Sequence, residues 1–132
     1  MIFVDTSFWV GLHNGRDHRH PDAAALLEQH AGAPLLTTDQ VRGETWTFLR
    51  RRGGHRAAVA FLDVLDASPR VSVEPVTAED QDLALAWLRQ HDEREYSFVD
   101  ATSFAVMRRR RLRDAFAFDG DFVAAGFVEL RP

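Results

Sequence analysis

The chain has 132 residues, a mass of 15.0 kDa and a formal net charge of −4. This length suits one domain around one hydrophobic core, so we expect a single domain over residues 1–132 and exclude a two-domain enzyme. With 45% hydrophobic and 27% charged residues the composition is typical of a globular protein, and no apolar run approaches the ~18 residues that cross a bilayer.

Lysine and cysteine are both absent, so all 16 residues in the Lys+Arg total are arginines. Without lysine there is no P-loop, so we expect no nucleotide cofactor, and Schiff-base chemistry is excluded. Without cysteine there is no thiol nucleophile and no Cys-ligated zinc. The chain also begins without the basic segment of a secretory signal, which predicts a cytoplasmic protein. The chemistry must come from carboxylates, histidines and hydroxyls.

The predicted elements alternate between strand and helix along the chain. Short apolar or alternating runs predict strands at 1–4, 35–38, 71–76, 115–118 and 127–130. Helical patterns begin near Thr6 and cover 21–30, 39–52, 55–67, 77–91 and 97–111. Such alternation predicts a three-layer α/β/α sandwich with a mostly parallel central sheet. Pro75 places the 71–76 strand at an edge of that sheet.

Four carboxylates occupy positions that a solvated surface acid would not. Asp5 and Asp119 each follow an apolar strand, at the edge where open α/β sheets bind ligands. Glu44 lies beside the predicted core-facing stripe of its helix, and Asp100 is surrounded by apolar residues on nearly every side. That stripe consists of Val41, Thr45, Phe48 and Leu49.

Each carboxylate also has a structural explanation. Asp5 could cap a helix, Glu44 could be a surface acid, and Asp100 could pair with an arginine. All four together are harder to explain, because like charges ~4 Å apart cost up to about 4 kcal/mol per pair at an effective dielectric of ~20. A bound divalent cation is the simplest compensation.

Four sequence blocks then resemble the PIN-domain ribonucleases of the VapC toxin family, over essentially the whole chain. They are Val4-Asp5-Thr6-Ser7, Arg42-Gly43-Glu44-Thr45, Ser97-Phe98-Val99-Asp100-Ala101 and Ala117-Phe118-Asp119-Gly120-Asp121-Phe122. The resemblance implies a PIN-like fold and a Mg²⁺ or Mn²⁺ site formed by Asp5, Glu44, Asp100 and Asp119, with Asp121 as an accessory acid.

Some parts of this site stay open at the level of sequence. The family usually has Thr or Ser where this chain has Ala117, so either Asp119 or Asp121 could be the fourth ligand. The hydroxyls of Thr6 and Ser7 could orient a ligand or a water beside Asp5, or could cap the first helix.

The resemblance further implies a metal-dependent endoribonuclease, the toxin of a type II toxin–antitoxin system, which leaves a 3′-hydroxyl and a 5′-phosphate. It implies a homodimer and a cognate antitoxin whose tail enters the acidic groove. The alternative is a catalytically degenerate PIN scaffold that binds RNA or a protein, which Ala117 favours. An aspartyl-nucleophile phosphatase is excluded, because Ser7 replaces its second aspartate and its lysine is absent.

Two arginine clusters either contact RNA phosphates or are solvated helix ends that interact favourably with the helix dipole. Arg42, Arg50 and Arg51 are assigned to RNA, and a second block covers Arg108 to Arg111 and Arg113. We expect Trp46 in a protein interface or under a neighbouring helix. A patch of His13, His18 and His20 invites a zinc hypothesis, but it lacks the helical spacing of zinc ligands.

Overall fold

The computed structural model describes residues 1–132 as an α/β protein with one five-stranded parallel sheet in the order β3-β2-β1-β4-β5. The strands are β1 (Ile2–Val4), β2 (Leu35–Thr38), β3 (Val71–Glu74), β4 (Asp114–Phe116) and β5 (Val128–Glu129). The helices are α1 (Thr6–His13), α2 (His20–Gln29), α3 (Asp39–Gly53), α4 (His55–Ala67), α5 (Ala78–Gln90), α6 (Phe98–Arg109) and α7 (Asp121–Ala124).

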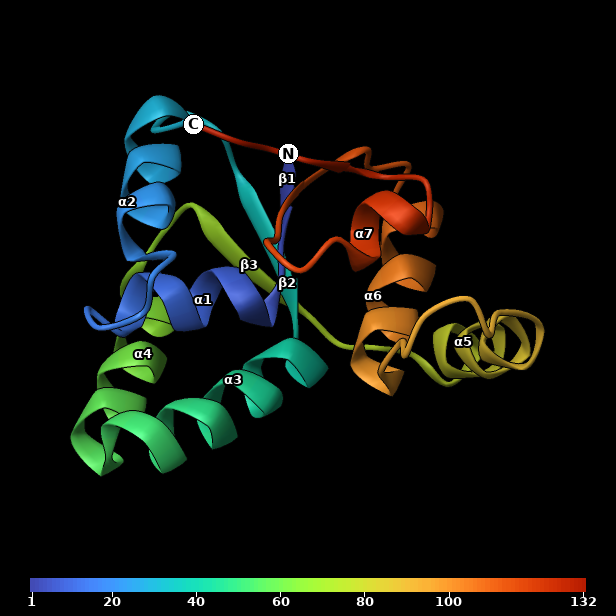
Figure 1. Cartoon of the computed structure of the whole chain (residues 1–132), viewed down its shortest axis with the longest axis horizontal. Coiled ribbons are helices and arrows are strands. Elements are labelled where there is room, and N and C mark those ends of the chain that lie inside the picture. Colours follow the sequence, from blue (N-terminus) through green and yellow to red (C-terminus); the bar gives the residue numbers. More distant parts are fainter.

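Helices cover both faces of the sheet, which confirms the predicted three-layer architecture. Figure 1 shows α1 to α4 on one side of the strands and α5 to α7 on the other. The central strands β1 and β2 are buried along their whole length, as expected for parallel strands packed on both faces. β3 lies at an edge of the sheet, as Pro75 predicted, but it ends at Glu74, two residues earlier than the predicted strand.

The chain reverses its winding direction at β1, and this reversal positions the functional residues. From β1 the chain proceeds to β2 and β3, then crosses back to β4 on the other side of β1. Ligands bind at the carboxyl ends of strands flanking such a switch point. Asp5 directly follows β1, and Asp119 lies three residues after β4.

Part of the predicted stripe on α3 is wrong. Val41, Thr45 and Leu49 are buried, but the Phe48 side chain is exposed, with a relative accessibility of 39%. α4 packs along the other side of α3, where the half-buried Trp46 meets His55 edge to face. The buried arc of α3 is therefore centred on Thr45 and Leu49, and Phe48 lies at its border. Trp46 lies under a neighbouring helix, one of its two predicted locations.

The second arginine block is engaged in contacts within the fold. Arg109 donates hydrogen bonds to Asp80 and Glu74, Arg110 donates to Glu74, and Arg113 pairs with Asp114. Arg108 lies over the rings of Trp87, Phe104 and Phe127. These contacts give four of the five arginines of the block a structural role within the fold, and Arg111 is exposed. None of the seven helices combines the length and apolar composition needed to cross a membrane.

Candidate active site

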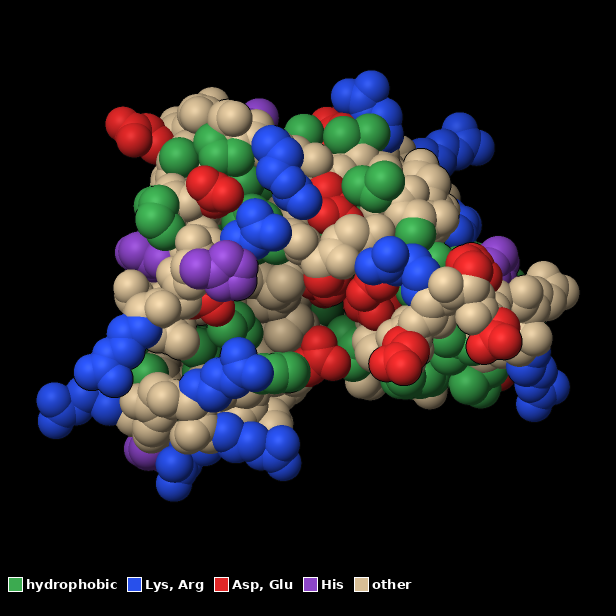
Figure 2. Space-filling view, viewed as in Figure 1, with side chains coloured by type: hydrophobic (Ala, Val, Ile, Leu, Met, Phe, Trp, Pro, Cys, Tyr) green, Lys and Arg blue, Asp and Glu red, His purple; other side chains and the backbone are tan.

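A cleft of about 490 Å³ opens at the carboxyl ends of β1 and β4. Its lining includes the predicted acids Asp5, Glu44, Asp100, Asp119 and Asp121 and both predicted hydroxyl residues, Thr6 and Ser7. Figure 2 shows acidic side chains around the hollow at the centre of this face, and arginines over α3 and α4 beside it. The fold therefore brings together all the acids that the sequence singled out.

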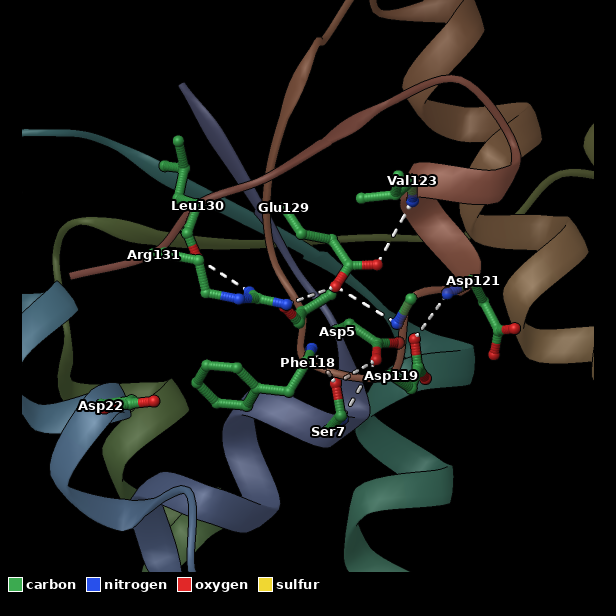
Figure 3. Close-up of polar contacts among 12 residues, drawn as sticks. Asp5, Ser7, Asp22, Phe118, Asp119, Asp121, Val123, Glu129, Leu130 and Arg131 are labelled. Atoms are coloured by element: carbon green, nitrogen blue, oxygen red, sulfur yellow. Dashed lines mark hydrogen bonds and ion pairs between the residues drawn. The ribbon is translucent and has the colours of Figure 1, made fainter.

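Asp5 is held at the junction of β1 and α1. It is the N-cap of α1, and its Oδ2 accepts hydrogen bonds from the Ser7 backbone N–H (3.1 Å) and the Ser7 hydroxyl (2.7 Å). The Ser7 Oγ in turn accepts a hydrogen bond from the Phe118 N–H at 3.0 Å (Figure 3). Ser7 thus fixes Asp5 and ties it to the segment that carries Asp119. Helix capping and a ligand role for Asp5 are compatible.

Asp100 lies in the first turn of α6 and has no arginine partner. Its Oδ2 accepts from the Ser97 N–H (3.0 Å), and its own N–H donates to the Ser97 Oγ (2.9 Å), which forms a capping box. The residue is buried. The alternative that an arginine neutralises Asp100 is therefore wrong.

Burial raises the pKa values of three carboxyl groups in the cleft. The pKa of Asp5 rises to about 8, because of burial first and then the nearby charge of Asp119, against the lowering by the Ser7 bonds. Burial raises the pKa of Asp100 to about 7 and that of Asp119 to about 6, with further contributions from neighbouring acids. Their charged forms are costly, and a cation would relieve that cost.

The donor set suits a hard divalent cation. Carboxylate oxygens of Asp100, Asp119 and Asp121 lie within 4.8 Å of one another. Asp5 and Glu44 fall outside this trio and line the same cleft. Oxygen donors are what Mg²⁺ and Mn²⁺ prefer. The Thr6 hydroxyl is buried without a protein partner, which leaves it available to a water or a ligand.

Asp119 and Asp121 differ in their protein partners. Asp121 Oδ1 accepts from Arg94 Nε at 2.7 Å, so its charge is largely balanced within the chain. Asp119 Oδ1 accepts only from the Asp121 N–H, at 3.1 Å, and its backbone carbonyl accepts from Arg94 Nη2. Of the two carboxylates, Asp119 therefore has fewer competing partners within the chain for the fourth ligand position, which the sequence left open between them.

The arginines predicted to bind RNA are only partly at the cleft. Arg51 lines a depression that adjoins the cleft at Glu44 and Phe48, whereas Arg42 and Arg50 are exposed elsewhere on α3. Arg52 lines both hollows, with its guanidinium 5.0 Å from the Phe48 ring centroid. It belongs to the same arginine cluster in the sequence but was not among the residues assigned to RNA. The basic ledge beside the acids consists of Arg51 and Arg52.

The three histidines do not form a metal site. His13 packs edge to face against Phe61, and His20 Nδ1 lies 3.0 Å from the Gly11 carbonyl oxygen. Only His18 lines the cleft, at its exposed rim. The zinc hypothesis therefore has no support from their placement.

Comparison with known proteins agrees with this geometry. The PIN domain family model matches residues 2–128. The 23S rRNA-specific endonuclease VapC20 of Mycobacterium tuberculosis, curated for strains CDC 1551 / Oshkosh and ATCC 25618 / H37Rv, is 58% identical over 132 residues, which is 100% of this chain and 99% of that protein.

Two solved structures have the same fold. The crystal structure of M. tuberculosis VapC20, described as a sarcin–ricin loop cleaving toxin, matches with a TM-score of 0.95 and 56% identity over 100% of both chains. A chain of a toxin–antitoxin complex from Klebsiella pneumoniae matches with a TM-score of 0.68 and 18% identity, covering 98% of this chain and 100% of its own, which shows the fold alone. The chain therefore belongs to the PIN-domain family and, within it, to the VapC toxins.

Proposed function

We propose that this protein is a metal-dependent endoribonuclease, the toxin of a type II toxin–antitoxin pair, with 23S rRNA as its substrate. The observation that carries the proposal is the set of buried carboxylates with raised pKa values that converge in one cleft. The activity of VapC20, which aligns over the full length, supports the substrate class and a sarcin–ricin loop target. The intact acids and this relative argue against the degenerate scaffold.

Asp5, Glu44, Asp100 and Asp119 would hold Mg²⁺ or Mn²⁺, with Asp121 beside them. The ion would supply an activated water and stabilise charge on the leaving oxygen. The chain itself orients the reactants: Ser7 fixes Asp5, and the unpartnered Thr6 hydroxyl offers a hydrogen bond to a water. Arg51 and Arg52 hold phosphates at the edge of the cleft, where the acids would otherwise repel the RNA.

We also propose that a cognate antitoxin inserts its tail into the acidic cleft. An arginine of that tail would compete with the metal for the carboxylates. The homodimer and the cytoplasmic location remain predictions. Light scattering of the purified protein would measure the oligomeric state. An rRNA substrate would itself place the active protein with the ribosomes.

The function is tested by mapping RNA ends in cells after the protein is induced. We expect a new 5′-phosphate end in 23S rRNA at one position, and no such end with the Asp100→Asn variant. New ends scattered over many messenger RNAs with 23S rRNA intact would contradict the proposed substrate. No new ends with either protein would contradict the endoribonuclease activity.

The basic ledge gives a separate prediction about RNA affinity. Arg51→Ala and Arg52→Ala should each weaken binding of a hairpin RNA and reduce the slope of log K against log salt by about one unit, because each removes one phosphate contact. Arg89→Ala, an exposed arginine on α5, is the matched control and should leave the slope unchanged. Equal slopes for wild type and the three variants would show that Arg51 and Arg52 do not contact RNA phosphates.

A further inference from the structure

One buried carboxylate lies behind the turn that carries Asp119 and Asp121. Glu129, the last residue of β5, has a side chain that is 1% exposed. Its Oε1 accepts from the Gly120 N–H (3.2 Å) and from Arg131 Nη2 (2.8 Å), and its Oε2 accepts from the Val123 N–H (3.2 Å). Figure 3 shows these bonds converging on Glu129 from the turn and from the C-terminal segment.

The turn depends on an unusual backbone conformation. Gly120 has φ of 83°, in the left-handed region, and a Cβ there would lie 3.3 Å from Arg94 Nη2. The Gly120 N–H that Glu129 binds belongs to this residue. The bond therefore fixes the peptide between the two acids of the turn, and with it the direction in which both side chains leave the backbone.

Arg131 holds the residues that precede Asp119 in the chain. Its Nη1 donates to the Ala117 carbonyl oxygen at 2.8 Å, and its guanidinium lies 5.5 Å from the Phe118 ring centroid. Together Glu129 and Arg131 hold the segment before Asp119, the peptide after it, and the first turn of α7. Ala117, whose side chain offers no hydrogen bond, is thus held through its backbone.

We propose that Glu129, supported by Arg131, is a positioning residue of the metal site, which holds Asp119 and Asp121 in the geometry that binds the ion. This inference rests on the proposed metal-dependent function. Glu129 lies outside the lining of the cleft, so it supports the site from behind the turn and touches neither RNA nor metal.

Glu129→Gln is an informative change because glutamine has the shape of glutamate but only one acceptor oxygen in place of two. The two carboxylate oxygens accept from three N–H donors on both sides. A glutamine amide has one oxygen, so its NH₂ group must face at least one backbone or guanidinium donor in either orientation. The peptide at Gly120 or at Val123 then loses its partner.

Mn²⁺ binding to the purified, folded protein is the primary measurement, by electron paramagnetic resonance of the free ion. We expect Glu129→Gln to raise the Mn²⁺ dissociation constant at least tenfold. In cleavage of a sarcin–ricin hairpin at saturating Mn²⁺, kcat should fall while KM for RNA stays within twofold, because the arginine ledge is intact. Arg131→Met, at a half-exposed side chain, should shift the Mn²⁺ affinity in the same direction by less.

Glu74→Gln is the matched control, because it also removes the negative charge of a carboxylate that accepts from arginine, away from the cleft. It should leave the Mn²⁺ affinity unchanged. Wild-type affinity in Glu129→Gln, or in Arg131→Met if Glu129→Gln does not fold, overturns the positioning role and leaves the proposed function standing. A wild-type protein that binds no Mn²⁺ overturns both. An equal loss of affinity in Glu74→Gln also overturns the positioning role.

Discussion

Asp100→Asn should raise the melting temperature of the metal-free protein at pH 8 and abolish RNA cleavage. Asp100 is buried among other acids, and burial raises its pKa to about 7, so its charged form destabilises the fold at pH 8. The amide oxygen can still accept from the Ser97 N–H, so the capping box survives. We expect a gain of about 1–3 kcal/mol in the free energy of unfolding without metal.

Added Mg²⁺ should make wild type more stable than Asp100→Asn, the reverse of the order without metal. Wild type should gain stability with added Mg²⁺ according to RT ln(1 + [L]/Kd), whereas the variant lacks a ligand and should gain much less. Four melting curves, two proteins with Mg²⁺ or with EDTA, measure this. An Asn variant that is less stable than wild type in EDTA would contradict a cluster of uncompensated carboxylates.

The stability of metal-free wild type should fall as the pH rises from about 6.5 to about 8.5, by roughly 1–3 kcal/mol. Asp5 and Asp100 have pKa values raised from 3.8 to about 8 and about 7, so the folded state holds protons that the unfolded state has already released. Stability from such groups is complete below pH 3.8 and is lost as the pH passes through the raised values. Burial lowers the pKa of His13 from 6.5, so the titration of His13 makes stability rise with pH. That rise falls below the pH range of this prediction.

Urea unfolding at several pH values in EDTA measures this dependence, with and without excess Mg²⁺. The ion should stabilise the protein more at pH 8.5 than at pH 6.5, because it binds the ionised carboxylates. Asp5→Asn should flatten the metal-free profile, since the group with the highest raised pKa is removed. A metal-free stability that is constant or rises over this range would contradict the raised pKa values.

The sequence predicted the convergence of these acids in one cleft, because the signals for it are local. An acid at the end of an apolar strand, as at Asp5, or inside an apolar helix, as at Asp100, is unusual enough to be recognised one residue at a time. The strand and helix alternation then brings these positions to one edge of the sheet.

The errors arose where a side chain's environment depends on packing between elements. Phe48 fitted the apolar stripe of α3, but the position of α4 decides which side of that stripe is covered. The arginines at 108–111 formed an apparent basic patch, yet Glu74 and Asp80, distant in sequence, pair with Arg109. Glu129 was missed because its donors come from a turn nine residues away. α7, at 4 residues, is too short to show helical periodicity.

Metal-dependent cleavage by purified protein is the most direct test of the central claim that these carboxylates form a nuclease site. The measurement is single-turnover cleavage of a sarcin–ricin hairpin RNA with Mg²⁺ or with EDTA, for wild type and Asp100→Asn, followed by analysis of the product ends. We predict one cut by wild type in Mg²⁺, with a 5′-phosphate product, and no cut in EDTA or by the variant. Equal cleavage by wild type in EDTA, or by the Asn variant in Mg²⁺, would contradict a metal site built on Asp100.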